Sequence, residues 1–282
     1  MTKLKLRDAM GFFRTIKAQW IRWVKTDFFR PGIFFWNSIL PLAWGLQFYF
    51  YYLPFEFGSI ELEFEGPGIV GVDLVSFTLT GQICWMLFIN TSLFGGAFFM
   101  RERWEGTLEV LLLSPASRPG IIAGTAFAGA TNFLWFALGL GLILLLVDIH
   151  LQLESWLTIV IALLVAFLTL LALGMFFESF FIASRLGGMW ATSIQEPLQF
   201  SSGLIFPIQY LPKALRALSV AIPFTYVLLI VRGVLLGGLK IRDVLWELVI
   251  LIVMIILLFL SSVIFLAKVE AHVKKQANLN MF

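Results

Sequence analysis

Few residues of this 282-residue sequence are placed where they could catalyse a reaction. The one cysteine, Cys84, lies within an apolar run, and the two histidines, His150 and His272, lack the spacing of metal ligands. No Lys directly follows a Gly, so the phosphate-binding loop GxxxxGK(S/T) is missing. No Ser, His and carboxylate fall on adjoining segments as nucleophilic catalysis would require. We therefore expect no catalytic site, no metal site and no nucleotide bound by this chain.

One acidic residue, Glu196, lies about ten residues into an apolar run and is followed by the helix-kinking Pro197. A charge at such a depth costs at least about 2.5–3.5 kcal/mol on insertion scales, so an ionisable residue there is a functional candidate. With Gln195 and Gln199, Glu196 either borders a substrate route or subunit interface, or is a protonated or hydrogen-bonded structural residue. A second acid, Glu178, precedes Arg185 by two helical turns, and both are interpreted as side chains that reach the membrane interface.

The segment that follows the second apolar run mixes both signs of charge with large apolar side chains. Gly106 breaks it once, and Ser114, Pro115 and Pro119 punctuate the return to apolar sequence. From the residues alone it is either a polar surface helix suited to docking or an ordinary solvated loop. Its candidate docking residues are Arg101, Glu102, Arg103, Trp104, Glu105, Thr107, Leu108 and Glu109.

The composition of the chain indicates the class of fold that positions these candidate residues. The chain is 60% hydrophobic and 13% charged, whereas soluble domains average about 25% charged residues. Thirty Phe and ten Trp are more than one compact core usually holds. The basic residues flank apolar runs and form no exposed stripe, so a nucleic-acid partner is not expected. We predict an all-α membrane protein in contact with lipid.

A membrane span needs about 20 predominantly apolar residues, and the sequence contains six clear runs of that kind. They are Ile33–Leu53, Leu74–Met100, Gly120–Val147, Trp156–Phe181, Leu186–Phe206 and Val244–Ala267. The prediction is a single transmembrane domain over residues 1–282, with a bundle at 33–267 and a tail at 268–282.

The distribution of charge predicts the orientation of these spans. The acidic stretch Pro54–Asp73 and the link Asp148–Ser155 have no Lys or Arg. Fifteen of the twenty basic residues fall in the amino terminus, in Arg101–Pro119, at Arg185 and in the tail. Cytoplasmic loops are enriched in Lys and Arg, so both termini are expected on the cytoplasmic side of the cell (inner) membrane. The first span is expected to act as an uncleaved insertion signal.

Ala214–Leu236 is also long and apolar enough to cross, although Arg216, Pro223 and Arg232 interrupt it. Charge alone does not decide between six and seven spans. The surrounding cluster of Gly and Pro favours broken, re-entrant helices, which are tolerated at membrane depth when packed in protein.

The first 30 residues predict an amphipathic helix. Aromatic and aliphatic side chains including Phe12, Ile16 and Trp20 share one face, and cations such as Arg14 and Lys17 lie towards the other. Such a helix suits the inner membrane surface or a protein partner, and the two placements are compatible.

Two stretches resemble the type-2 ABC exporter permeases, also called type V ABC exporters. The segment RERWEGTLE followed by LLLSPASR, over residues 101–118, is similar to one motif of that family. The segments GLIFP at 203–207, LP at 211–212, PFTY at 223–226 and RG at 232–233 are similar to a second motif of the family, with Ile222 standing where the family commonly has Asn. The candidate residues of this re-entrant outer motif are Gly203, Pro207, Pro212, Pro223, Tyr226 and Arg232.

The resemblance implies six spans, a cytoplasmic coupling helix after the second, and re-entrant outer helices between the fifth and sixth. It also implies a second permease subunit, in a homodimer or heterodimer, and a separate cytoplasmic ABC ATPase that carries ATP and Mg. The expected cargo is an amphipathic or lipid-linked drug, lipid or polysaccharide. The competing hypotheses are an ion-coupled secondary transporter that uses Glu196 and a membrane-embedded scaffold or enzyme.

Overall fold

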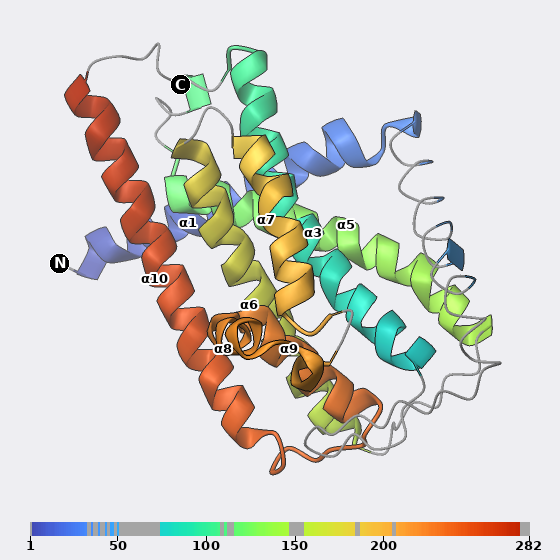
Figure 1. Ribbon diagram of the computed structural model, residues 1–282. Helices are drawn as coiled ribbons and strands as arrows, with labels where there is room; N and C mark the ends of the chain where they lie inside the picture. The colour runs from blue at the N-terminus through green and yellow to red at the C-terminus, as the bar shows by residue number, and fades with distance from the viewer. Residues whose placement is uncertain are drawn as a thin grey trace.

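The computed structural model of the protein describes residues 2–32, 35, 39, 43, 46, 47, 50, 74–107, 110, 111, 116–146, 155–183, 187–204 and 207–276. All the regular secondary structure in these residues is helical (Figure 1). In chain order the helices are α1 (Thr2–Trp23), η1 (Val24–Phe28), α3 (Leu74–Trp104), α5 (Arg118–Leu146), α6 (Trp156–Ala183), α7 (Gly187–Ser201), η2 (Ile208–Tyr210), α8 (Lys213–Ala221), α9 (Pro223–Leu235) and α10 (Leu245–Gln276).

Helices α3, α5, α6, α7 and α10 occupy five of the six predicted apolar runs. The predicted first span Ile33–Leu53 lies largely outside the described residues, as do the acidic stretch Pro54–Asp73 and the end of the tail. Among the described helices, Trp156–Phe180 of α6 and Leu245–Lys268 of α10 are long and apolar enough to cross a membrane. A third crossing is counted only if α8 and α9 are taken as one bent span.

Helix α6 lies at the centre of the bundle and packs against α3, α5, α7, α9 and α10 (Figure 1). The core beside it is aromatic. The Trp85 ring lies 5.1 Å from the Phe88 ring and 5.6 Å from the Phe224 ring, centroid to centroid, and all three are buried. These rings of α3 and α9 therefore pack on each other.

Small polar side chains join the helices at several levels. The Asn132 amide of α5 donates to the Asn90 side-chain carbonyl of α3 over 2.8 Å. The Thr91 hydroxyl of α3 lies 3.3 Å from the Leu170 carbonyl of α6. A Cβ added at Gly174 would meet the Thr91 backbone at 3.0 Å, so α3 and α6 approach closely there. Small residues and interhelical hydrogen bonds of this kind hold membrane helices together, since lipid supplies no hydrophobic force between them.

Helix α1 packs along the first half of α5. A Cβ added at Gly120 would lie 3.0 Å from the Phe12 carbonyl, and one added at Gly124 would lie 2.8 Å from Gln19 Cβ. The predicted amphipathic pattern is present, because Trp23 is buried while Arg14 and Lys17 are exposed. The exposed surface of α1 therefore carries cations together with Phe13, which is 69% exposed, and the other face contacts protein.

Helices α8 and α9 are bent by 88° about the break at Ile222. The Ile222 amide donates to the Ser219 carbonyl, and the Thr225 amide donates to the Ile222 carbonyl, each over 3.1 Å. Pro223 occupies the first helical position of α9, where its missing amide hydrogen costs nothing. At 1.5 Å per residue α9 is about 20 Å long, short of the roughly 30 Å hydrocarbon core. Residues 214–236 therefore do not form one straight spanning helix.

Candidate functional site: the two ends of helix α3

Helix α3 carries a buried polar contact at each of its ends. Phe77 lies near its first residue and Glu102 near its last, which places them about 37 Å apart along the axis at 1.5 Å per residue. Each contact joins α3 to an element distant in sequence. We describe the carboxyl-terminal end first, because the charged segment begins there.

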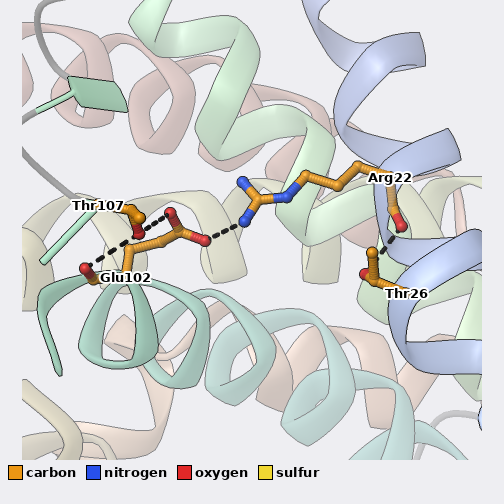
Figure 2. A network of polar contacts seen from close by, with 4 residues as sticks. All are labelled: Arg22, Thr26, Glu102 and Thr107. Carbon is orange, nitrogen blue, oxygen red and sulfur yellow. Dashed lines mark hydrogen bonds and ion pairs between the residues drawn. The ribbon is translucent and has the colours of Figure 1, made fainter. Parts of the chain in front are cut away.

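Glu102 is buried, with 1% of its surface exposed, and it ion-pairs with Arg22 of α1 (Figure 2). Arg22 Nη2 donates to one carboxylate oxygen, and the Thr107 hydroxyl donates to the other over 2.7 Å. Thr26 of η1 donates through its hydroxyl to the Arg22 carbonyl over 2.9 Å. A buried carboxylate is tolerable when its oxygens are paired and hydrogen-bonded in this way.

The chain reverses directly after Glu102 through a glycine turn. Gly106 has a φ of +71°, a conformation that glycine adopts without strain. The Thr107 amide donates to the Glu102 carbonyl over 2.9 Å, the long bond that closes a Schellman-type helix end. The same turn places the Thr107 hydroxyl on the carboxylate, so local backbone geometry helps to hold Glu102.

Residues 104–107 of this turn are exposed, and Trp104 has 77% of its surface exposed. The exposed Trp104 indole presents a large apolar area next to the Glu105 carboxylate, and no described part of the chain covers this area. Aromatic residues of this kind are frequent anchors of protein interfaces. Arg101 is half-buried, Arg103 has no described side chain, and Leu108 and Glu109 lie outside the described residues.

The carboxyl-terminal end of the charged segment, residues 101–118, also contacts α1. The Ser117 amide donates to the Thr15 hydroxyl over 3.3 Å, and Leu111 packs in a small apolar cluster with Phe12 and Ile16. Together with the Arg22–Glu102 ion pair, these contacts attach both ends of the segment to one helix. The sequence analysis did not predict that Arg22 and Thr15 contact the charged segment, because nothing distinguishes them from other polar residues of an amphipathic helix.

At the other end of α3, Arg232 of α9 is buried with 4% of its surface exposed. Its Nε donates to the Phe77 carbonyl over 3.1 Å, Nη1 to the Gly203 carbonyl over 2.7 Å and Nη2 to the Leu204 carbonyl over 2.9 Å. The guanidinium carbon also lies 3.4 Å from the centre of the Phe77 ring, a cation–π contact. None of the partners that the structure describes for Arg232 is a carboxylate.

The rest of the second sequence motif shapes the turns around this arginine. Gly203 has a φ of +82°, Pro207 and Pro212 precede η2 and α8, and the Tyr226 hydroxyl donates to the Val220 carbonyl over 3.1 Å. The motif therefore brings Gly203 and Arg232 into direct contact and uses the prolines as helix boundaries.

The remaining candidate residues lie on α7. Glu196 and Pro197 are part of this helix, but the Glu196 side chain lies outside what the structure describes. Gln195 and Gln199 are half-buried. The pathway role of Glu196, Gln195 and Gln199 stays a prediction.

The interpretation of Glu178 as an interface side chain is wrong. Glu178 is fully buried, and the Thr125 hydroxyl of α5 donates to it over 2.6 Å. A carboxylate held by a neighbouring helix does not extend to the membrane surface. Arg185 lies outside the described residues.

These features define a multi-pass helical membrane protein with a charged turn at one end of a long helix and a bent helix pair at the other. Residues 70–264 match the family described as ABC-2 family transporter protein, and the chain belongs to that family. The resemblance seen in the sequence is thus confirmed. No curated protein matches the chain. The membrane domain of the family is the non-catalytic permease, which pairs with a separate ABC ATPase that binds ATP.

Proposed function

We propose that this chain is the transmembrane permease of an ATP-driven exporter in the cell (inner) membrane. It moves an amphipathic or lipid-linked substrate, such as a drug, lipid or polysaccharide, out of the cytoplasm. Two permease subunits, identical or different, work with cytoplasmic ABC ATPase subunits that carry ATP and Mg. Both termini face the cytoplasm, following the distribution of Lys and Arg.

The observation that supports ATPase docking is the division of the charged turn into an outward part and a buried part. Trp104 and Glu105 are exposed, whereas Glu102 is buried beneath them against Arg22. The exposed residues offer the ATPase an apolar anchor and a charge. The ion pair of the buried Glu102 with the partly exposed Arg22 fixes the turn to α1, so that a push on the turn moves α1 and α3 together.

The contacts at both ends of the segment make this transmission physically reasonable. A flexible loop would absorb displacement by changing its own shape. A segment attached at Glu102 through Arg22 and at Ser117 through Thr15 cannot do so without breaking those bonds. The movement of an ATPase would then pass into α3, α5 and α1.

The bent α8–α9 pair supports a re-entrant unit on the outer side and six spans in all. Its 88° bend and the length of α9 favour a helix pair that enters and leaves on one face. Broken helices at membrane depth must pack in protein, and the α8–α9 pair does so because its inner side is buried and hydrogen-bonded.

Docking is tested with Trp104→Ala and Glu105→Arg in the permease reconstituted with its ATPase. Loss of a large interface anchor costs about 2 kcal/mol, so Trp104→Ala should weaken ATPase binding about 30-fold. Binding is measured by titration of labelled ATPase, together with substrate transport. Glu105→Arg should lower both, because it reverses the charge that the turn offers the ATPase.

The matched control is Trp246→Ala at the start of α10, where the indole is 71% exposed and far in sequence from the turn. We expect binding and transport unchanged in this variant. Wild-type binding and transport in both Trp104→Ala and Glu105→Arg would refute docking at the turn. Transport by the purified chain alone on an ion gradient would instead favour a secondary transporter that uses Glu196.

A further inference from the structure

We propose that Arg232 is a positioning residue that fixes the α8–α9 unit to α3, so that movement begun at the charged turn reaches this unit through α3. This inference rests on the proposed function. It assigns the buried guanidinium a part in coupling, beyond its place in a sequence motif.

Three hydrogen bonds from one planar group connect three parts of the chain. Arg232 belongs to α9, the Phe77 carbonyl belongs to α3, and the carbonyls of Gly203 and Leu204 belong to the turn after α7. A guanidinium presents its donors in a rigid fork, so the three acceptors are fixed relative to one another. An ammonium group would be a point charge on a flexible stem and could not hold all three at once.

The surroundings of the guanidinium are shaped to receive it. A Cβ added at Gly81 would collide with Arg232 Nη2, so α3 leaves out a side chain where the guanidinium lies. The positive φ of Gly203 forms the turn whose carbonyl accepts from Nη1. The Phe77 ring covers the guanidinium from one side. Two glycines and an aromatic ring on two different elements thus fit one cation.

Helix α3 then links this contact with the charged turn. It is continuous from Leu74 to Trp104 and carries Phe77 and Gly81 at one end and Glu102 at the other. Trp85 and Phe88 of the same helix also pack on Phe224 of α9. These contacts are apolar, and apolar side chains can slide past each other, whereas the hydrogen bonds of Arg232 have fixed directions.

Cys84 provides an internal reporter of this contact. It is the one cysteine of the chain, and it is buried. It follows Phe77 by seven residues and Gly81 by three, which places all three on one face of α3. Separation of α9 from α3 should therefore expose its thiol to a maleimide.

The test uses Arg232→Lys and Arg232→Gln in the full permease–ATPase complex in lipid vesicles. We expect ATPase binding to stay at the wild-type level while substrate moved per ATP hydrolysed falls at least tenfold. Maleimide labelling of Cys84 during ATP turnover should become at least tenfold faster. Arg216→Gln on the exposed side of α8 is the matched control and should change neither quantity.

Gly81→Ala gives an independent variant that keeps Arg232 but displaces its guanidinium, and it should show the same fall in substrate moved per ATP hydrolysed. If the Arg232 variants fail to assemble, Gly81→Ala still tests the inference. Full transport per ATP in Arg232→Lys or Gly81→Ala, with Cys84 still protected, would overturn the inference. A wild-type chain that binds no ATPase would instead refute the proposed function itself.

Discussion

At the scale of single residues, the protein buries two charged side chains by different means. Glu102 receives an opposite charge from Arg22 and a hydroxyl from Thr107. Arg232 receives three backbone carbonyls and an aromatic face. An ion pair can be broken by removing either partner, whereas the carbonyls that hold Arg232 belong to the backbone and cannot be substituted. The two contacts therefore require different tests.

The Arg22–Glu102 pair is suited to a double-mutant cycle. Leaving a buried hydrogen-bonding group without its partner costs about 1–3 kcal/mol, so Arg22→Gln, which leaves the buried Glu102 carboxylate unpaired, should destabilise the chain by about that much. Glu102→Gln should cost less, because the Arg22 side chain is 39% exposed and can be hydrated. The double variant should lose less than the sum, with a coupling energy of at least about 0.5 kcal/mol. Unfolding free energies in detergent micelles measure these values.

Glu105→Gln is the control for this cycle, since Glu105 is exposed on the same turn. It should change stability by less than about 0.5 kcal/mol. Strict additivity of the Glu102 and Arg22 variants would show that the ion pair contributes no energy of its own.

At the scale of elements, the position of α1 depends on two glycines of α5. Gly120 and Gly124 are one helical turn apart and let the α1 backbone approach. Close approach through small residues spaced by four is a frequent mode of helix contact in membranes. This contact sets where Arg22 and Thr15 lie, so the attachment of the charged segment follows from helix packing.

Glycine-to-alanine changes separate packing from helix propensity. Gly124→Ala should destabilise the chain by about 1–3 kcal/mol, because the new methyl would lie 2.8 Å from Gln19 Cβ. Gly11→Ala on α1 meets no atom within 4 Å and should stabilise the chain by about 0.5–1 kcal/mol through propensity alone. Thermal unfolding in lipid nanodiscs measures both.

The two variants make the same chemical change, so opposite signs identify packing as the cause. Limited proteolysis of α1 should also become faster in Gly124→Ala and stay unchanged in Gly11→Ala. Equal stabilisation by both changes would contradict a close α1–α5 contact.

At the scale of the whole molecule, the bundle has a protein-facing centre and a lipid-facing surface. Buried residues gather where α3, α6 and α9 meet. Helix α10 presents apolar side chains outward, among them Ile252, Ile256 and Leu260. Lipid accepts such a surface, so the apolar face of α10 requires no protein partner.

The proposed orientation is tested with tags at the two termini and one inserted into Pro54–Asp73. We expect protease in inverted membrane vesicles to remove both terminal tags and to spare the internal one. The physical reason is the excess of Lys and Arg near the termini and its absence from Pro54–Asp73. Protection of the tag after Phe282 in inverted vesicles, with cleavage in right-side-out cells, would require an odd number of spans.

The sequence by itself determined the class of protein and the location of its described helices. Apolar length is a local property, and five predicted runs coincide with α3, α5, α6, α7 and α10 to within a few residues at most ends. Glycine and proline are local signals too, so the break in Ala214–Leu236 and the turn at Gly106 could be anticipated. The family resemblance came from short motifs that are likewise contiguous.

Tertiary structure alone decided which polar residues meet. The pairing of Arg22 with Glu102, of Thr125 with Glu178, and of Arg232 with distant carbonyls depends on how each helix is rotated about its axis. Most of these helices have apolar residues on all sides, so their composition does not reveal how each helix is rotated about its axis. Packing of small residues such as Gly81 and Gly124 against specific neighbours fixes it, and those neighbours come from other parts of the chain.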